Sequence, residues 1–424
     1  MDWLILVGGF VILLLLRVPL AYCMCLSSLA FILHTGMPVT VLAQRLSAGL
    51  NSFPLLAVPF YIFAGQLMNT SGVSTRIFNF AASIVGHIRG GLCHVSIVAN
   101  MIFAGISGTA VSEAAAMGAI EMKVMRDEGY DPAVSAAVVA SSATIGPIIP
   151  PSVIFIIYGV MAEVSIGRLF AGGFIPGALM GLSLMVLVYF IAGRRTMPRR
   201  PRATLRQVGT SFGQAFLSLM MPIIILGGIG FGVVTPTESG AIAVGYAILL
   251  GLVYKEIKRE NIHSILVESV TVTCSVMFII AAATLFSWLL VSQNIPQKAT
   301  ELILSITHNK WMVLFFLNVV LLIMGCFLDT MAILITVTPV FVPLATALNI
   351  DLVHFGVVLG LNLMIGALTP PMGILFYIVS DVGRVPVEKV IKELWPFLFP
   401  LGIVLGIITY VPSVVTWLPM LIFK

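Results

Sequence analysis

Charge is the property that this sequence has least of. Only 9% of its 424 residues are charged and 59% are hydrophobic, whereas ~25% of the residues of a soluble domain are charged. So few charges cannot cover the surface of a soluble protein this large, which excludes that class and predicts an all-α polytopic membrane protein. The net charge of +5 does not indicate nucleic-acid binding, because the basic residues lie in short loops between apolar segments.

Patterns of reactive residues are equally scarce. The six histidines and five cysteines show no metal-binding spacing, and the cysteines do not form a disulfide framework. The sequence has no GxxxxGK[ST] motif and no Ser-His-Asp arrangement that would lie at one depth. We therefore expect neither an enzyme nor an ATP-driven pump, and no organic cofactor. The cysteines are Cys23, Cys25, Cys93, Cys274 and Cys326.

One apolar segment, 133–160, is long enough to cross a bilayer but is interrupted near its middle by Gly146, Pro147, Pro150 and Pro151. A helix cannot keep its hydrogen-bond ladder through these prolines. In hydrocarbon each unsatisfied backbone group costs several kcal/mol, so a break is tolerated where protein, water or an ion satisfies it. The break is a candidate binding site, with an ordinary proline kink as the alternative.

A second copy of this break favours the binding site. The pair Pro150-Pro151 recurs 220 residues later as Pro370-Pro371, and Gly146 recurs as Gly366. Broken helices at corresponding positions of two halves are typical of the midplane site of a secondary transporter. Further matches at the same offset are Gly105 with Gly325, Asp131 with Asp351, Val138 with Val358, Ile154 with Ile374, and Pro176 with Pro396.

The order of apolar segments predicts two inverted-topology repeats. Each repeat has a re-entrant hairpin, because the arms of the hairpin are about half as long as a crossing requires. The remaining helices of each repeat would form a scaffold, as the family resemblance described below implies. We expect the first repeat at 1–200, with scaffold helices over 1–70, an interfacial helix at 75–91, a hairpin at 92–123, a broken helix at 131–163 and a helix at 169–193. The second, 201–424, has scaffold helices over 213–254, an interfacial helix at 262–270, a helix at 272–292, a hairpin at 311–345, a broken helix at 351–380 and a helix at 396–418.

The basic residues predict the orientation. With the loop from Arg194 to Arg206 in the cytoplasm, 17 of the 22 Lys and Arg lie on that side. This layout has ten crossings and both termini outside, and its two hairpins open on opposite sides. The five basic residues outside are Arg45, Arg168, Lys298, Lys310 and Lys424.

Two acidic residues, Glu113 and Asp329, lie near the predicted hairpin tips. A charge at the bilayer centre costs ~2.5–3.5 kcal/mol on insertion scales and needs a cavity, a partner or an ion. Asp329 is either near a cation site or a helix cap, and Glu113 has a solvent vestibule as its alternative. Carbonyl and hydroxyl oxygens with few carboxylates favour an alkali cation, and sodium is the simplest choice. The hydroxyls beside the breaks belong to Ser107, Thr109, Ser112, Thr144, Thr330 and Thr369.

Several motifs together resemble the large membrane (permease) subunit of tripartite ATP-independent periplasmic (TRAP) transporters, over essentially the whole chain. The family commonly has alanines where this chain has Ser239-Gly240, and often has serine at the position of Thr109. The motifs are Pro59-Phe60, Phe63-Ala64-Gly65-Gln66-Leu67-Met68, Ser107-Gly108-Thr109, Ile145-Gly146-Pro147-Ile148-Ile149-Pro150-Pro151-Ser152, Thr235-Pro236-Thr237-Glu238, Gly366 and Thr369-Pro370-Pro371.

The resemblance implies sodium-coupled import of a small organic acid, of the sialic acid or C4-dicarboxylate type, across the bacterial inner membrane. It implies an elevator movement, in which the hairpins and broken helices slide as a transport domain against the scaffold. It also implies two partners, a small four-helix membrane subunit and a periplasmic substrate-binding protein that delivers the acid.

The resemblance further implies which residues bind the ions and the substrate. Helix N-termini that follow the breaks favour an anion there. One sodium site would use Ser107, Gly108, Thr109, Ser112, Thr144 and Gly146; the other would use Gly325, Asp329, Thr330, Gly366, Thr369 and Met372; the substrate would lie between Pro150, Pro151 and Ser152 on one side and Pro370 and Pro371 on the other.

Two other functions stay open. A sodium-coupled carboxylate carrier or exchanger of similar architecture would work alone and take its substrate from solution. An ion channel has less support, because the chain has paired proline breaks and no selectivity-filter motif.

Overall fold

The computed structural model describes residues 3–195, 197–256 and 259–423, and this part of the chain contains helices and no strands. Long apolar runs form the helices, and many of the helices begin directly after a Gly, Pro, Asp or Asn residue. The first half contains α1 (Trp3–Leu15), α2 (Leu20–His34), α3 (Thr40–Leu50), the short 3₁₀ helix η1 (Phe53–Leu56), α4 (Ala57–Thr70), α5 (Val73–Val85), α6 (Gly91–Ser107), α7 (Ala110–Asp127), α8 (Pro132–Ala143), α9 (Val153–Met161) and α10 (Ile166–Arg194).

The second half repeats this order of long helices, a helical hairpin and a broken helix. Its elements are α11 (Leu205–Gly230), α12 (Pro236–Tyr254), α13 (Arg259–Ser292), α14 (Ile295–Ile306), α15 (Lys310–Gly325), α16 (Thr330–Ala347), α17 (Leu352–Gly366), α18 (Ile374–Gly383), α19 (Val387–Tyr410) and α20 (Ser413–Ile422).

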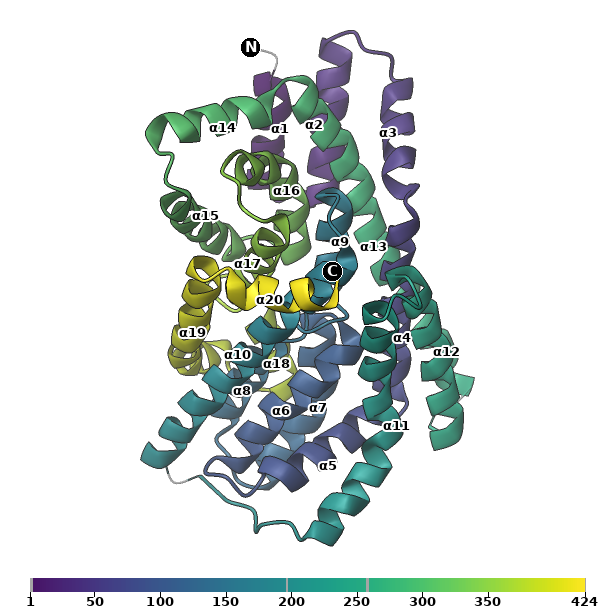
Figure 1. Cartoon of the computed structure of the whole chain (residues 1–424), viewed down its shortest axis with the longest axis vertical. Helices are drawn as coiled ribbons and strands as arrows, with labels where there is room; N and C mark the ends of the chain where they lie inside the picture. Colours follow the sequence, from purple (N-terminus) through teal and green to yellow (C-terminus); the bar gives the residue numbers. More distant parts are fainter. Residues whose placement is uncertain (1–2, 196, 257–258, 424) are drawn as a thin grey trace.

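The two hairpins approach the middle of the molecule from opposite ends. In Figure 1, α6 and α7 lie in the lower half and α15 and α16 in the upper half. The predicted broken helices are present as α8 with α9 and as α17 with α18, and the Pro150–Pro151 and Pro370–Pro371 peptide bonds are both cis. The all-α fold with inverted repeats, each carrying a hairpin and a broken helix, is therefore confirmed.

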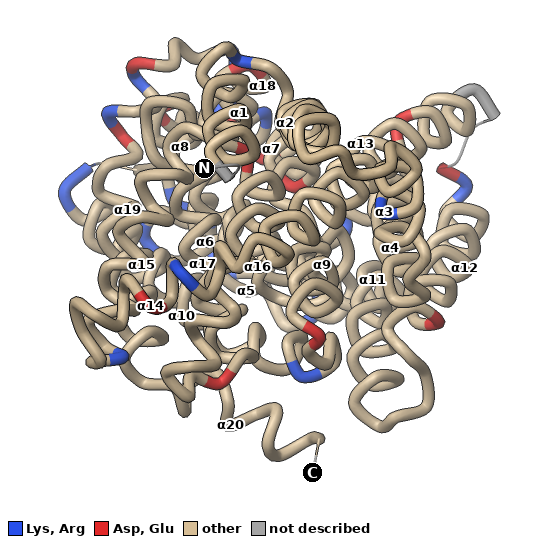
Figure 2. The backbone as a smooth tube through the Cα atoms, turned by 90° about the horizontal axis from the view of Figure 1, so that it is seen from above, with Lys and Arg blue, Asp and Glu red and all other residues tan. Residues whose placement is uncertain are grey.

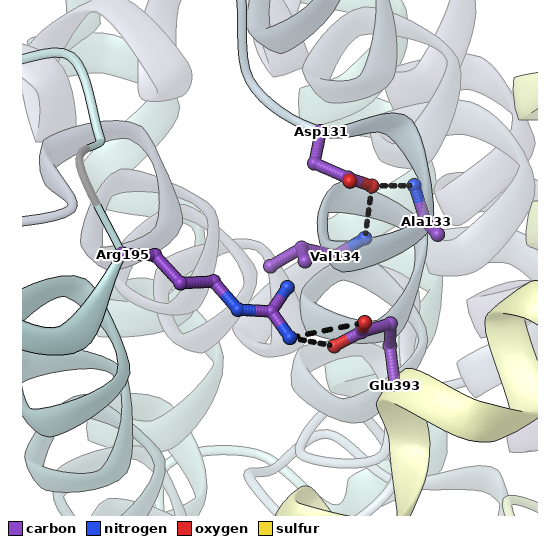
Figure 3. A network of polar contacts seen from close by, with 5 residues as sticks. All are labelled: Asp131, Ala133, Val134, Arg195 and Glu393. Carbon is purple, nitrogen blue, oxygen red and sulfur yellow. Dashed lines mark hydrogen bonds and ion pairs between the residues drawn. The ribbon is translucent and has the colours of Figure 1, made fainter.

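Matching aspartates begin the broken helices of both repeats. Asp131 Oδ1 accepts hydrogen bonds from the backbone N–H groups of Ala133, at 2.7 Å, and Val134, at 3.2 Å (Figure 3). Asp351 caps α17 in the same way, at 2.8 and 2.9 Å. A side-chain cap satisfies N–H groups that have no partner within the helix. The two halves thus share the residue that starts each broken helix.

The basic loop between the repeats is attached to the ends of the first hairpin and α19. Arg195 forms an ion pair with Glu393 at 2.9 Å, which Figure 3 shows beside the start of α8. Arg200 Nε donates to Glu128 at 2.8 Å. Burial raises the pKa of Tyr130 to about 12, so its hydroxyl stays protonated and donates to the Pro198 carbonyl at 2.8 Å. These contacts hold the loop against one face of the molecule.

Two groups of helices pack side by side. In one group α4 packs on α12, α13 packs on both α2 and α3, and α5 packs on α11. In the other, the hairpins, broken helices, α10 and α19 pack on one another across the repeats, with α7 against α18 and α8 against α19. Charged residues are sparse along the backbone tube and lie mainly toward its periphery (Figure 2). The first group contains the helices expected as scaffold and also α5 and α13, and it is called the scaffold below; the second group is called the transport part. That the two parts move relative to each other stays a prediction.

Within the described residues, six helices are long and apolar enough to cross a membrane, or eight if each of two bent pairs counts as one span. The bent pairs are α3 with η1 and α4, at 63°, and α14 with α15, at 120°. The predicted ten crossings leave out α16 and the pair α14 with α15, because α15 and α16 form the second hairpin, and they add α1, α2 and the two broken helices, whose pieces are shorter. The number of crossings therefore stays a prediction.

Some of the predicted element ends are wrong. The expected interfacial helix at 262–270 and the helix at 272–292 are one continuous helix, α13, because no glycine or proline interrupts this stretch. The connections around Arg45 and Lys298 are the helices α3 and α14. The expected last helix at 396–418 starts earlier and is divided at Val411 and Pro412 into α19 and α20.

Candidate functional site

The tip of the first hairpin, Ser107–Thr109, lies against the first break. Gly108 has φ +63°, and a Cβ there would be 2.6 Å from the carbonyl oxygen of Pro151. The Gly108 carbonyl accepts from the Val153 N–H at 3.4 Å, where α9 begins. Only a residue without a side chain allows this turn and this approach together. The hairpin tip therefore closes directly onto the backbone of the broken helix.

A buried carboxylate occupies the space beside Gly146. A Cβ on Gly146 would lie 2.3 Å from both carboxylate oxygens of Glu113. Glu113 is fully buried, and its Oε1 accepts from the Ser107 hydroxyl at 2.7 Å. The alternative that Glu113 faces a solvent-filled space is therefore wrong, because its side chain is buried in the protein beside the break. The sequence showed this residue near the tip but gave no sign of its burial.

The second hairpin reaches the second break by a close backbone contact. A Cβ on Gly325 would be 2.7 Å from the Cα of Gly366, and the reverse also holds. The Met372 N–H donates to the Cys326 carbonyl at 3.1 Å. The Met372 side chain itself is 56% exposed. The structure thus brings the predicted ligands Gly325 and Gly366 together, and it places Met372 beside them through its backbone.

Asp329 caps α16. Its Oδ1 accepts from the N–H groups of Met331, at 2.9 Å, and Ala332, at 3.2 Å. The residue is exposed and also faces the cavity described next. The capping alternative is therefore observed, and the contribution of Asp329 to a cation site stays a prediction.

Both hairpin tips and both breaks meet at one small cavity of about 70 Å³, here called the central cavity. Four helices, α7, α9, α16 and α18, contribute residues of their first turns to its wall. Helix N-termini carry unpaired N–H groups and a partial positive charge, which favours an anion. The wall consists of Gly108, Thr109, Ala110, Val111, Pro147, Ile154, Asp329, Thr330, Met331, Met364, Ala367, Ile374 and Leu375.

A larger cavity of about 530 Å³, here called the vestibule, lies between the scaffold helices α4 and α13 and the first hairpin. It shares Thr109, Val111 and Met331 with the central cavity. Asn69 of α4 donates to the Ser112 hydroxyl at 2.8 Å across its wall. The predicted ligand Ser112 is therefore engaged by the scaffold, on the vestibule side of the hairpin. The other residues that line the vestibule include Gln66, Ser107, Glu268 and Val276.

Three predicted hydroxyls bond to nearby atoms of their own segments. Thr144 donates to the Ser141 carbonyl at 2.6 Å and Thr369 to the Ile365 carbonyl at 2.7 Å. The Ser152 hydroxyl accepts from the Phe155 N–H at 3.2 Å and caps α9. These bonds stabilise the ends of the broken helices and keep the hydroxyls beside the breaks.

The proline pairs are not in the wall of the central cavity, where Pro147 and Ala367 lie instead. Pro150 and Pro151 are buried, whereas Pro371 is exposed. The predicted contact of substrate with the four prolines therefore stays a prediction, and the cavity lies beside the expected position. The glycine and proline residues locate the breaks in the sequence, but the depth of each side chain depends on contacts between the repeats.

A second buried carboxylate, Glu121, lies two turns after Glu113 on α7 and was not predicted from the sequence. Glu121 accepts from Ser96 at 2.6 Å and from Asn100 at 3.2 and 3.3 Å, and Asn100 also donates to Ser142 at 2.9 Å. The sequence signal that could have indicated this site is the position of Glu121 within an apolar hairpin arm. The corresponding region of the second repeat contains a neutral network of Asn318, Asn362 and Thr409.

Inverted repeats, paired broken helices and one shared cavity define a helical membrane transporter. The chain matches the profile of the family described as "Tripartite ATP-independent periplasmic transporter, DctM component" over residues 7–414. The chain belongs to this family, which confirms the resemblance. Its curated relatives are permease subunits of transporters and not enzymes, and the protein is a multi-pass protein of the bacterial inner membrane.

The similar proteins include permeases for different acids. The chain is 42% identical to the "Sialic acid TRAP transporter large permease protein SiaM" of Vibrio cholerae over 97% of both chains. It is 41% identical to the "Sialic acid TRAP transporter permease protein SiaT" of Haemophilus influenzae, over 97% of this chain and 67% of that protein. It is 38% identical to the "C4-dicarboxylate TRAP transporter large permease protein DctM" of Pseudomonas aeruginosa over 92% of both.

A solved structure shares the fold at low sequence identity. The YdaH transporter of Alcanivorax borkumensis, whose structure is described as having an unusual topology, superposes with a TM-score of 0.65. The match covers 90% of this chain and 89% of that chain, with 14% sequence identity. This likeness supports the arrangement of the helices.

Proposed function

We propose that this permease couples the inward movement of sodium to the import of a small organic acid, which a periplasmic substrate-binding protein delivers. The observation that carries the proposal is the central cavity, where both hairpin tips and both helix breaks meet. Broken helices of this kind supply backbone oxygens for cations and helix N-termini for an anionic substrate. One site can thus bind the two charges that a symporter must move together.

The position of the cavities supports an elevator movement. The central cavity lies within the transport part, and the vestibule lies between that part and the scaffold helices α4 and α13. Most of the vestibule wall is apolar, and Asn69 with Ser112 forms a polar bond across it. An interface with few polar bonds can slide without leaving many buried groups unpaired. We therefore propose that the hairpins and broken helices move as one body along α4 and α13.

The central cavity of about 70 Å³ is too small for a sialic acid or a C4-dicarboxylate. It adjoins the vestibule, because Thr109, Val111 and Met331 line both cavities. We propose that the carboxylate group of the substrate enters the central cavity, while the remainder of the substrate lies in the vestibule. Relatives named for sialic acid and for C4-dicarboxylates support this class of substrate. The word "large" in these names supports a small membrane subunit as the second partner, and we propose that it is the four-helix subunit that the family resemblance implies.

Uptake by proteoliposomes tests the proposal. The permease, its small membrane subunit and the substrate-binding protein are combined, and uptake of labelled sialic acid and of a labelled C4-dicarboxylate is measured under an inward sodium gradient. We expect uptake of one acid, and only with the binding protein present. Uptake at the same rate without the binding protein would instead establish a stand-alone carrier, and single-channel currents would establish a channel.

A further inference from the structure

Glu113 is a buried carboxylate for which the protein supplies too few partners. It is fully buried on α7, and its Oε2 has no hydrogen-bond partner among the described residues. The two ion pairs that these residues form, Arg195 with Glu393 and Arg200 with Glu128, do not involve it. An ionised carboxylate without a counter-charge is costly inside a protein, and more so at membrane depth.

The surroundings of Glu113 fit a cation. The carboxylate lies against Gly146 in the first break, and the Ser107 hydroxyl at the hairpin tip is bonded to its Oε1. Among the hydrogen bonds of the described residues, none ends on the carbonyl oxygens of Thr144 or Gly146. A carboxylate, a hydroxyl and free carbonyls are the hard oxygen ligands that alkali cations take.

We propose that Glu113 is the anionic ligand of the first cation site, and that its charge is balanced by the bound sodium. This inference rests on the proposed sodium coupling and adds a residue to it. The Ser107 hydroxyl orients the carboxylate, and Oε2 is the atom left to contact the ion. Gly146 has no side chain, so the carboxylate can lie directly against the backbone of the break.

The two repeats differ at this point. The position 220 residues after Glu113 is Ile333, which is buried and apolar. In the first site, the buried carboxylate of Glu113 would therefore neutralise the sodium. The second site has no carboxylate at the equivalent position. The acidic residue predicted for the second site, Asp329, is exposed and caps α16, so it balances a sodium less effectively than a buried carboxylate does, and the second sodium would depend more on the anionic substrate. The first sodium would bind without substrate.

Glu121 provides a matched control on the same helix. It is also fully buried, but both of its oxygens accept hydrogen bonds, from Ser96 and Asn100. The change of Glu to Gln is the same at the two positions. A difference between the two variants therefore reports the local site and not the loss of a buried acidic residue in general.

The test measures thermal unfolding of the purified permease while sodium replaces potassium at constant ionic strength, without substrate or partners. A ligand that binds the folded state raises the midpoint of unfolding. We expect Glu113→Gln to raise the sodium concentration for half of the effect ~10-fold or more, a loss of binding free energy that corresponds to one decade in affinity. Glu121→Gln should keep the wild-type sodium dependence. In potassium alone, Glu113→Gln should be at least as stable as the wild type, because it removes an unbalanced charge.

Each outcome decides between the proposals. A wild-type sodium dependence in Glu113→Gln overturns the assignment of Glu113 and leaves sodium-coupled transport intact. A wild-type protein that sodium does not stabilise overturns both. If Glu113→Gln does not fold, Glu113→Asp replaces it: the shorter carboxylate should fold and bind sodium more weakly, and unchanged affinity would contradict the proposal.

Discussion

Gly146 leaves room for one carboxylate, and this space is the most specific feature of the first break. A Cβ atom added at Gly146 would lie 2.3 Å from the carboxylate oxygens of Glu113. A methyl group at Gly245, in α12, would meet nothing within 4 Å. An alanine at position 146 must therefore displace the carboxylate or the break. The residue therefore controls the geometry of the proposed cation site.

We therefore expect Gly146→Ala to reduce sodium-dependent uptake at least ~10-fold and Gly146→Leu to abolish it, because a collision of this kind costs ~1–3 kcal/mol or more. Membrane insertion should continue, since the hydrophobicity of the segment is kept. Uptake by proteoliposomes and the amount of inserted protein are measured side by side. Gly245→Ala is the matched control and should transport normally. Normal sodium dependence in both position-146 variants would contradict this role.

Asp329 is both a helix cap and part of the cavity wall, so its charge and its capping function can be separated. Asparagine caps helices about as well as aspartate does. Asp329→Asn should therefore fold normally and weaken sodium binding more than substrate recognition. The readout is the sodium concentration for half-maximal uptake, compared with the half-saturating concentration of the loaded binding protein. An unchanged sodium value would remove Asp329 from the cation site.

Some residues of the site could be predicted and others could not. Gly108, Gly146 and Gly366 follow from local rules, since helix breaks and tight approaches favour glycine. The burial of Glu113 and Glu121 depends on which side of α7 faces the break and the neighbouring arm, and this is set by packing between distant segments. Sequence spacing alone does not contain that information.

The broken helices are defined by the residues at their ends. Asp131 and Asp351 start α8 and α17 with the same pair of backbone hydrogen bonds, as Figure 3 shows for Asp131. Proline and glycine then end the first half of each helix before the break. These local signals explain why the sequence predicted both breaks. The continuity of α13 and the separation of α19 from α20 were missed, because an amphipathic stretch was read as a separate helix and a bend as a continuous one.

We expect Asp131→Ala to lower the free energy of unfolding by about 1 kcal/mol, because the first N–H groups of α8 lose their acceptor. Asp131→Asn should retain most of the stability, since its amide oxygen can accept the same bonds. Chemical or thermal unfolding of both variants in the same detergent measures the difference. Equal stability of the alanine and asparagine variants would show that the cap does not contribute.

At the scale of the whole molecule, the proposed elevator movement requires the contact between Asn69 and Ser112 to break. Asn69 belongs to the scaffold helix α4 and Ser112 to the first hairpin. A cross-link there would fix the transport part in the present position. The Ser83 and Ser211 hydroxyls offer a comparison, because they bond at 2.9 Å between α5 and α11, outside the hairpins and broken helices.

Cysteines at positions 69 and 112, in a background without the five native cysteines, should stop uptake when oxidised and restore it when reduced. The pair at positions 83 and 211 should cross-link without this loss. Uptake is measured before and after oxidation, with the extent of cross-linking read from the same samples. Full uptake by completely cross-linked Asn69→Cys, Ser112→Cys protein would exclude sliding at this interface.

The most direct test of the account is sodium-driven accumulation by the complete reconstituted transporter. The permease and its small membrane subunit are reconstituted in the bilayer, the loaded substrate-binding protein is added on one side, and an inward sodium gradient is the only imposed force. The account predicts that labelled organic acid accumulates above its outside concentration and leaves again when the gradient is dissipated. Equal accumulation under a potassium gradient with sodium absent would contradict it.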